Sequence, residues 1–207
     1  MNVGIDFDNT IVSYDKVFYA VALEQSLIPQ EIKESKMAVR DYLRSIDEND
    51  IWTELQGHVY GKRMLEAEIY PGFLKFLEFT KKNEINLSIV SHKTVYPYRG
   101  KKYNLHDSAR EFIAKRLSRD GKNFIPENKV FFETTQQDKA KRIGLEKCNF
   151  FIDDLPEIFC LENFPNKTIK CLFDPEGNNN DYKGKGDYKF SDWEQIISHL
   201  KHEISRR

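Results

Sequence analysis

Val3-Gly4-Ile5-Asp6-Phe7-Asp8-Asn9-Thr10 is the stretch of sequence that decides the fold. It begins as a short apolar run broken only by two acids, which is typical of a central parallel strand that is buried on both faces and ends at Asp8. Carboxylates at positions i and i+2 of a strand project to the same side, so we expect Asp6 and Asp8 to face one crevice.

Further short apolar runs predict four more strands, at residues 86–91, 129–132, 149–153 and 168–173. Helical patterns separate them, at residues 71–79, 107–117, 138–143, 156–162 and 192–204. Short strands that alternate with helices indicate an α/β fold with a parallel sheet and right-handed crossovers.

Residues 14–70 interrupt this alternation, because they contain helical patterns at 17–25, 31–43 and 51–66 and no strand. We therefore predict a helical cap at 14–70, inserted into a core formed by residues 1–13 and 71–207. The polar loop at 177–188 is not expected to build a core, and its Gly184-Lys185-Gly186 is only a weak phosphate-binding signal.

The composition is that of a globular protein, since 40% of the 207 residues are hydrophobic and 31% are charged. No apolar run has the length of a membrane span, and the acids near the N-terminus do not fit a signal peptide. Three cysteines, Cys148, Cys160 and Cys171, lack CxxC spacing, so we interpret them as buried thiols in a reducing compartment. These features predict a cytoplasmic location.

Positive charge is concentrated at residues 92–122, which hold nine basic and three acidic residues although the whole chain carries a net charge of only −1. An anion is the expected partner of such a segment, and a solvated helix face is the alternative. Nucleic acid is not implied, because the chain as a whole is not basic and carries no recognition motif.

Acidic, hydroxyl and amine side chains follow the predicted strands at their carboxyl ends, where open α/β sheets keep their ligand crevice. They are Asp6 with Asp8, Ser91, Lys139, and Asp153 with Asp154. Four converging acids cannot all ionise at neutral pH without compensating positive charge. Magnesium, a hard cation that prefers oxygen ligands, supplies it beside a phosphate.

Simpler interpretations exist for some of these residues. A calcium loop starting at Asp6 is disfavoured, since Ile11 stands where glycine is needed and Val17 where glutamate is needed. Asp154 could instead cap a helix that opens at Pro156. A lysine at position 139, in the first turn of its helix, is better explained by a nearby anion.

Four segments in this order resemble the motifs of the haloacid dehalogenase superfamily of phosphatases: GIDFDNT at 4–10, IVS at 89–91, the lysine at 139 and FIDD at 151–154. The ordered framework covers residues 3–173. PGFLKFL at 71–77 is similar to the segment before the second motif in members whose cap follows the first strand. The resemblance implies a Rossmann-like, three-layer core with a small α-helical cap.

The resemblance also implies a role for each motif residue. Asp6 would be the nucleophile and Asp8 the general acid and base, while Thr10 and Ser91 would donate hydrogen bonds to the phosphoryl group. Lys139 would neutralise charge there and orient Asp6. Magnesium would be held by Asp6, the backbone carbonyl of Asp8, and Asp153, with Asp154 or Glu157 in a more distant role.

Hydrolysis of a small phosphate monoester through an aspartyl-phosphate is the activity that the resemblance implies, because members that cleave carbon–halogen bonds lack an acid corresponding to Asp8. A phosphotransferase or mutase, or a noncatalytic binding subunit, remains the alternative. We further hypothesise that Lys93, Arg99, Lys101 and Lys102 contact a second anionic or sugar-like part of the substrate. No nucleic acid or membrane partner is expected, and the sequence does not indicate an oligomeric state.

Overall fold

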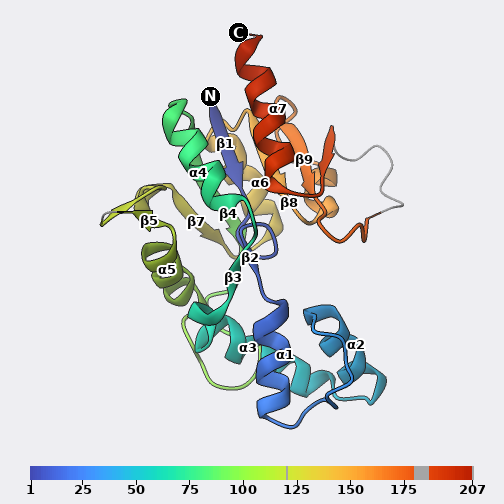
Figure 1. Ribbon diagram of the computed structural model, residues 1–207. Coiled ribbons are helices and arrows are strands. Elements are labelled where there is room, and N and C mark those ends of the chain that lie inside the picture. The colour runs from blue at the N-terminus through green and yellow to red at the C-terminus, as the bar shows by residue number, and fades with distance from the viewer. Residues whose placement is uncertain (120, 180–186, 207) are drawn as a thin grey trace. The chain divides into compact units, whose positions relative to one another are not determined.

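The computed structural model describes residues 1–119, 121–179 and 187–206 and divides the chain into two compact units (Figure 1). The first unit comprises Met1–Ile11, Ile69–His92 and Gly121–Arg207, and the second comprises Val12–Glu68 and Lys93–Asp120. The second unit thus contains residues 14–68 of the predicted insertion and also residues 93–120, which the sequence division assigned to the core, whereas Ile69 and Tyr70 fold with the first unit. Among the described residues, no helix is both long enough and apolar enough to cross a membrane.

The first unit is built on a parallel sheet of six strands, ordered β10-β9-β8-β1-β4-β7. The strands are β1 (Asn2–Ile5), β4 (Asn86–His92), β7 (Val130–Glu133), β8 (Phe150–Asp153), β9 (Ile169–Phe173) and β10 (Tyr188–Phe190). The chain starts in the middle of the sheet, adds β4 and β7 on one side and then β8, β9 and β10 on the other. This is the Rossmann order, whose direction reverses between β1 and β8.

Helices cover both faces of this sheet, which makes the first unit a three-layer α/β structure as predicted (Figure 1). On one face, α4 (Phe73–Lys82) packs beside α7 (Trp193–Ser205), and the Trp193 ring lies 4.7 Å from the ring centroids of Phe73 and Phe76. On the other face, α6 (Gln136–Leu145) packs against β4 and β7.

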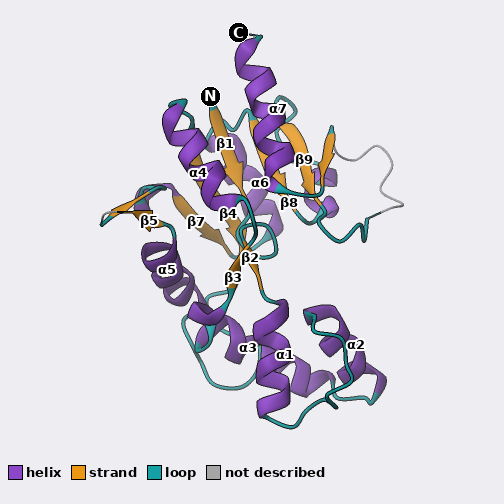
Figure 2. Ribbon diagram, in the orientation of Figure 1, coloured by secondary structure: helices purple, strands orange, loops and turns teal. Residues whose placement is uncertain are grey.

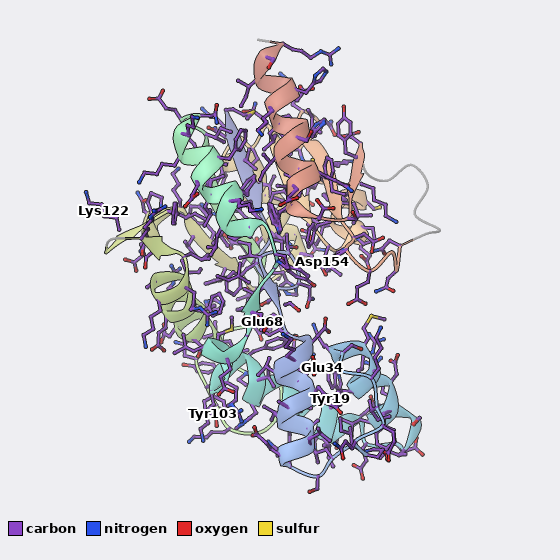
Figure 3. All side chains as sticks on the ribbon, in the orientation of Figure 1. Tyr19, Glu34, Glu68, Tyr103, Lys122 and Asp154 are labelled. Carbon is purple, nitrogen blue, oxygen red and sulfur yellow. The ribbon has the colours of Figure 1, made fainter. Side chains whose placement is uncertain are left out.

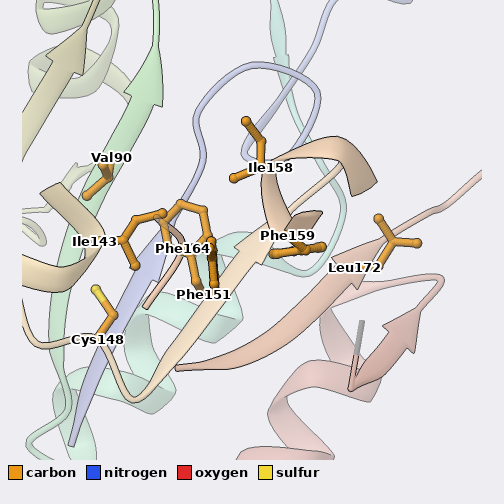
Figure 4. Close-up of a cluster of buried hydrophobic side chains, with 8 residues drawn as sticks. All are labelled: Val90, Ile143, Cys148, Phe151, Ile158, Phe159, Phe164 and Leu172. Carbon is orange, nitrogen blue, oxygen red and sulfur yellow. The ribbon is translucent and has the colours of Figure 1, made fainter. Parts of the chain in front are cut away.

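Buried apolar side chains join the α6 face to the sheet (Figure 4). Strands β4, β8 and β9 contribute Val90, Phe151 and Leu172, and α6 contributes Ile143. The short 3₁₀ helix η3 (Pro156–Cys160) adds further residues, so the segment after β8 is held against the same core. Its burial keeps the loop that carries Asp154 in place.

The second unit is mostly helical (Figure 2). Its helices are α1 (Asp15–Glu24), α2 (Lys36–Ser45), α3 (Asn49–Gly61), the 3₁₀ helix η1 (Met64–Glu66) and α5 (Leu105–Arg116). Aromatic rings form the packing centre, with Tyr14 and Phe18 contacting Tyr60 edge-on and Phe18 also contacting Trp52 at 5.0 Å. Short elements complete the chain: β2 (Val12–Ser13) and β5 (Ser118–Arg119) in the second unit, β3 (Glu68–Ile69) at the boundary, and β6 (Lys122–Asn123) and the 3₁₀ helix η2 (Glu127–Lys129) in the first unit.

A loop at residues 95–105 packs against α3 because two glycines of that helix leave room for it. A Cβ atom at Gly57 would lie 2.6 Å from the Pro97 side chain, and one at Gly61 would lie 2.4 Å from that of Tyr103. Two non-bonded carbon atoms cannot approach so closely, so only glycine at positions 57 and 61 lets the loop pack this tightly against α3. Together with the packing of α5 against α3 and η1, these contacts place residues 93–120 in the second unit.

Some details differ from the sequence-based predictions. Cys148 and Cys171 are buried and all three cysteines are free, but Cys160 is exposed at the end of η3, so the prediction of three buried thiols is wrong there. Of the helix predicted at 156–162, only Pro156–Cys160 is helical, as a short 3₁₀ helix, and the edge strand β10 was not predicted.

Candidate active site

The acids of the first and last motifs meet where the strand order reverses. Ile5 of β1 pairs with Ile152 of β8, so the next residues, Asp6 and Asp153, leave adjacent strands at the same edge of the sheet. The backbone N–H of Asp6 donates to the Ile152 carbonyl at 2.9 Å, which extends the ladder up to the site. This edge is where doubly wound α/β proteins bind ligands.

Lys139 lies between these two carboxylates. Its Nζ is 2.5 Å from Asp6 Oδ1 and 2.6 Å from Asp153 Oδ2, and all three side chains are buried. The position of Lys139 follows from the start of α6, where Thr135 caps the helix by accepting from the Asp138 N–H. The expectation that an anion explains a lysine in this turn is therefore confirmed.

Burial dominates the acid–base properties of this cluster. It raises the pKa of Asp6 to about 7, while Lys139 acts in the opposite direction and the carboxylates of Asp153 and Asp8 raise it further. Burial also raises the pKa of Asp153, against the lowering effect of Lys139. Burial alone would lower the pKa of Lys139, but Asp153 and Asp6 outweigh it, so that pKa lies above its usual value. The single ammonium group of Lys139 therefore does not supply enough positive charge to balance the carboxylates of Asp6 and Asp153.

Three acids could share a metal ion. Carboxylate oxygens of Asp6, Asp153 and Asp154 lie within 4.8 Å of one another, and Asp154 directly follows β8 (Figure 3). Hard oxygen donors that lack compensating charge are the ligands that magnesium prefers, so the cluster fits that ion. Within the described residues, the Asp8 and Glu157 carboxylates are not part of this group, and Glu157 is exposed. The geometry favours Asp154 over Glu157 as the additional acid.

Two hydroxyl side chains lie at the same end of the sheet. The buried Thr10 donates from Oγ1 to Asp154 Oδ1 at 3.3 Å, and its carbonyl accepts from Trp193 Nε1 at 3.3 Å. Ser91 is 1% exposed, and its Oγ is a buried polar atom without a hydrogen-bond partner among the residues that the structure describes. Since Ile5 pairs with Ile89, Ser91 lies one residue beyond the position opposite Asp6. Buried hydroxyls are normally paired, so this one has unused capacity to donate to a ligand.

A tight turn carries the chain from Asp6 to Thr10. The N–H of Ile11 donates to the Phe7 carbonyl at 3.1 Å, and Asn9 adopts a left-handed conformation with φ of 57°. Asparagine tolerates that region better than most residues do. Asp8, at the start of the turn, is half-buried.

The interpretation of Asp154 as a helix cap is not supported. Leu155 occupies the cap position of η3, which has no side-chain cap hydrogen bond. It is Asp153 Oδ1 that accepts from the Leu155 N–H, at 3.0 Å. The weak phosphate-binding signal at 184–186 lies outside the described residues.

Sequence reasoning missed Trp193. Its indole N–H holds the Thr10 carbonyl, and its ring fills the space between α7 and α4. The sequence signal was an aromatic residue directly after a helix-capping aspartate, Asp192, which accepts from the Gln195 N–H. That signal indicates a helix start and nothing about a contact with the first motif.

Comparison with solved structures identifies the fold. A haloacid dehalogenase superfamily hydrolase from Ehrlichia chaffeensis superposes with a TM-score of 0.58 at 14% identity, over 98% of this chain and 97% of that one. The chain has the haloacid dehalogenase fold. The family resemblance expected from the sequence is thus confirmed at the level of the fold.

Two further solved structures are similar to this chain. A putative hydrolase from Bacillus subtilis, described as bound to magnesium, matches with a TM-score of 0.58 at 14% identity, over 96% of this chain and 97% of that one. A β-phosphoglucomutase from Pyrococcus matches with a TM-score of 0.56 at 14% identity, over 100% and 99%. No protein-family model matches the sequence, and none of the curated proteins does either.

Proposed function

We propose that this protein is a magnesium-dependent phosphatase that hydrolyses a small phosphate monoester through an aspartyl-phosphate on Asp6. The observation that carries the proposal is the buried bridge from Asp6 through Lys139 to Asp153 at the reversal point of the sheet. A structural ion pair does not require a second buried carboxylate. An excess of buried acid beside an unpaired hydroxyl, Ser91 Oγ, is what a site for a metal ion and a phosphate requires.

In the first step, an Asp6 carboxylate oxygen attacks phosphorus and the bond to the leaving oxygen breaks, while Asp8 gives its proton to that oxygen. In the second step, Asp8 takes a proton from a water molecule. The water oxygen attacks the phosphorus of the aspartyl-phosphate, and the bond to Asp6 breaks. Inorganic phosphate leaves and both aspartates return to their starting states.

The surrounding side chains stabilise the phosphoryl group as it is transferred. Ser91 donates its hydroxyl hydrogen to a phosphoryl oxygen, and Thr10 does so once it turns from Asp154. Lys139 keeps one Asp6 oxygen fixed and neutralises charge beside it. Asp6, Asp153 and Asp154, with the Asp8 carbonyl, would hold magnesium, which when bound screens the nucleophile from the negative charge of the phosphate.

The second unit serves, in this proposal, as the cap that selects the substrate. Its helical content and the long insertion after the first motif support that role, because a closing cap excludes water from a small substrate. The proposed cap is larger than residues 14–70, since residues 93–120 fold with it.

A mutase or phosphotransferase is the second candidate, because one structure with a similar fold is a β-phosphoglucomutase. The first step is the same in both reactions, and the acceptor of the phosphoryl group differs. Reaction in ¹⁸O-labelled water separates them. A hydrolase places one labelled oxygen in the released phosphate, whereas a mutase yields a rearranged phosphate ester without label.

Magnesium-dependent turnover of an aryl phosphate tests the proposal. We expect Asp6→Asn to lower kcat at least about 10³-fold, because the amide cannot act as the nucleophile. Asp41→Asn, at an exposed position of α2, is the control and should retain wild-type activity. Equal rates for Asp6→Asn and the wild type would end the assignment, as would turnover that persists when all divalent ions are removed.

A further inference from the structure

An indole nitrogen of the last helix reaches the turn that carries Asp8 and Thr10. Trp193 Nε1 donates a hydrogen bond to the Thr10 carbonyl at 3.3 Å, although the two residues are 183 positions apart in the chain. Both side chains are fully buried, and both residues belong to the first unit. The contact therefore ties the start of α7 directly to the turn that follows Asp6.

The packing around the indole ring fixes the direction of its N–H. The ring centroid of Trp193 lies 4.7 Å from those of Phe73 and Phe76 in α4. It lies 5.5 Å from that of Phe173 at the end of β9. Gly72 leaves room for the Trp193 side chain, because a Cβ atom there would lie only 3.1 Å from Trp193 Cβ. A side chain enclosed in this way has few rotamers open to it, so the N–H points in one direction.

Other hydrogen bonds hold the turn at neighbouring residues. The Ile11 N–H donates to the Phe7 carbonyl at 3.1 Å, within the turn itself. The Ile11 carbonyl accepts from the Tyr70 N–H at 2.9 Å, just after the turn. The bond from the indole differs from these two, because it acts on the backbone of Thr10, whose side chain would bind the phosphate.

The proposed function requires the Thr10 side chain to change its partner. Thr10 Oγ1 donates to Asp154 Oδ1 at 3.3 Å, and in the proposed reaction it donates to a phosphoryl oxygen instead. Rotation about the bond between Cα and Cβ brings the hydroxyl to a defined place when the backbone stays still. A buried carbonyl is costly to separate from a buried N–H, because both groups lose their partner. The indole hydrogen bond therefore restrains the Thr10 backbone while the side chain turns.

We propose that Trp193 is a positioning residue, whose indole N–H holds the backbone of residues 8–10 in the geometry that phosphoryl transfer requires. The inference rests on the proposed function and extends it to a residue of the last helix. Trp193 acts through Thr10 and does not itself touch the substrate. Loss of the N–H should therefore slow the chemical step and leave substrate binding nearly unchanged, since a misplacement of about 1 Å can cost roughly 10²-fold in rate.

Replacement of Trp193 by phenylalanine tests this role. Trp193→Phe keeps an aromatic ring in the cluster and removes the N–H. In the magnesium-dependent assay with an aryl phosphate, we expect kcat to fall about tenfold or more and KM to change by less than about twofold. Phe76→Leu is the matched control, because it loosens the same aromatic cluster and leaves the indole N–H in place. Both variants should have a lower Tm, but Phe76→Leu should keep kcat within about twofold of the wild type at temperatures well below that Tm.

A second variant removes the hydrogen bond with little change in packing. Benzothienylalanine in place of Trp193 keeps the bicyclic shape of the side chain and has sulfur where the indole has its N–H, so it cannot donate. We expect it to reproduce the fall in kcat with a smaller loss of Tm than Trp193→Phe. The inference is overturned if Trp193→Phe and Phe76→Leu have the same kcat, or if the benzothienylalanine variant turns over at the wild-type rate.

Amide hydrogen exchange makes the test independent of turnover. The Ile11 N–H belongs to the turn, whereas the Asp6 N–H is bonded to the Ile152 carbonyl of β8 and serves as the internal reference. We expect the ratio of the Ile11 exchange rate to that of Asp6 to rise about tenfold or more in Trp193→Phe. The ratio should stay near the wild-type value in Phe76→Leu, because a global loss of stability raises both rates alike.

The two measurements separate the possible failures. If no phosphate ester is turned over but the exchange ratio rises in Trp193→Phe alone, the proposed function fails and the indole contact still holds the turn. If the wild type turns over the aryl phosphate and Trp193→Phe matches Phe76→Leu in kcat, the positioning role fails alone.

Discussion

Replacement of Lys139 by methionine tests the charge arrangement of the site through stability. The wild-type ammonium lies 2.5 Å from Asp6 Oδ1 and 2.6 Å from Asp153 Oδ2, and the exposed fractions of the three side chains are 1%, 6% and 0%. Solvent therefore cannot compensate for its loss. Methionine fills a similar volume, so the change removes mainly the charge.

The expected cost is about 3–5 kcal/mol, because removing one partner of a buried ion pair leaves an uncompensated charge. For a chain of this size that corresponds to a fall in Tm of roughly 6–20 °C. The loss should be measured by urea denaturation at pH 8 in the presence of a chelator. Lys129→Met is the control, since that lysine forms a 2.8 Å ion pair with Glu146 but is 46% exposed, and it should cost at most about 1 kcal/mol.

The loss of stability in Lys139→Met should also depend on pH. The pKa of Asp6 is about 7 in the folded protein, and loss of Lys139 raises it further. When a carboxyl group has a higher pKa in the folded than in the unfolded state, the protein becomes less stable as the pH rises from the unfolded-state pKa to the folded-state pKa. The stability difference between Lys139→Met and the wild type should therefore be larger at pH 8 than at pH 5.

A double variant completes this test. Lys139→Met combined with Asp153→Asn removes one positive and one negative charge, and it should be more stable than Lys139→Met alone. The reasoning is refuted if Lys139→Met costs no more than the Lys129→Met control, or if the second substitution fails to restore stability.

Three other predictions concern the site and the second unit. Ser91→Ala should leave the free energy of unfolding within about 1 kcal/mol of the wild type, because the hydroxyl is unpaired, yet raise KM or lower kcat roughly 10-fold or more in the aryl phosphate assay; wild-type kinetics would remove Ser91 from the site. Gly61→Ala should destabilise by about 1–3 kcal/mol in urea denaturation, because its Cβ would meet Tyr103, whereas Gly144→Ala, with its nearest contact at 3.5 Å, should be neutral or stabilising by up to about 1 kcal/mol; equal effects would contradict the packing argument. Magnesium at millimolar concentration should raise the Tm of the wild type more than that of Asp153→Asn in a thermal scan, since only a bound ion stabilises the folded state by mass action; equal shifts would argue against the metal site.

The sequence predicted the convergence of Asp6, Lys139 and Asp153 because all three follow strands of a parallel sheet. Apolar runs identified the strands, and parallel strands end at one edge, so residues at those ends meet whatever the intervening chain does. In the observed strand order, β1 and β8 are neighbours.

The division between the units was less accessible from the sequence. The helix α5 packs against α3 and η1, and the loop before it contacts Gly57 and Gly61, which lie some 40 residues earlier in the chain. The strand β10 has three residues, and only pairing with β9 defines it. Such long-range contacts leave no periodic pattern in the sequence.

Manganese in place of magnesium tests the central claim most directly, because its anomalous scattering locates it in crystals grown with the ion. The account predicts one strong peak bonded to carboxylate oxygens of both Asp6 and Asp153 at roughly 2.0–2.4 Å, with Asp154 alongside. A peak that contacts only one of the two motifs, or no peak near either aspartate at saturating manganese, would contradict it.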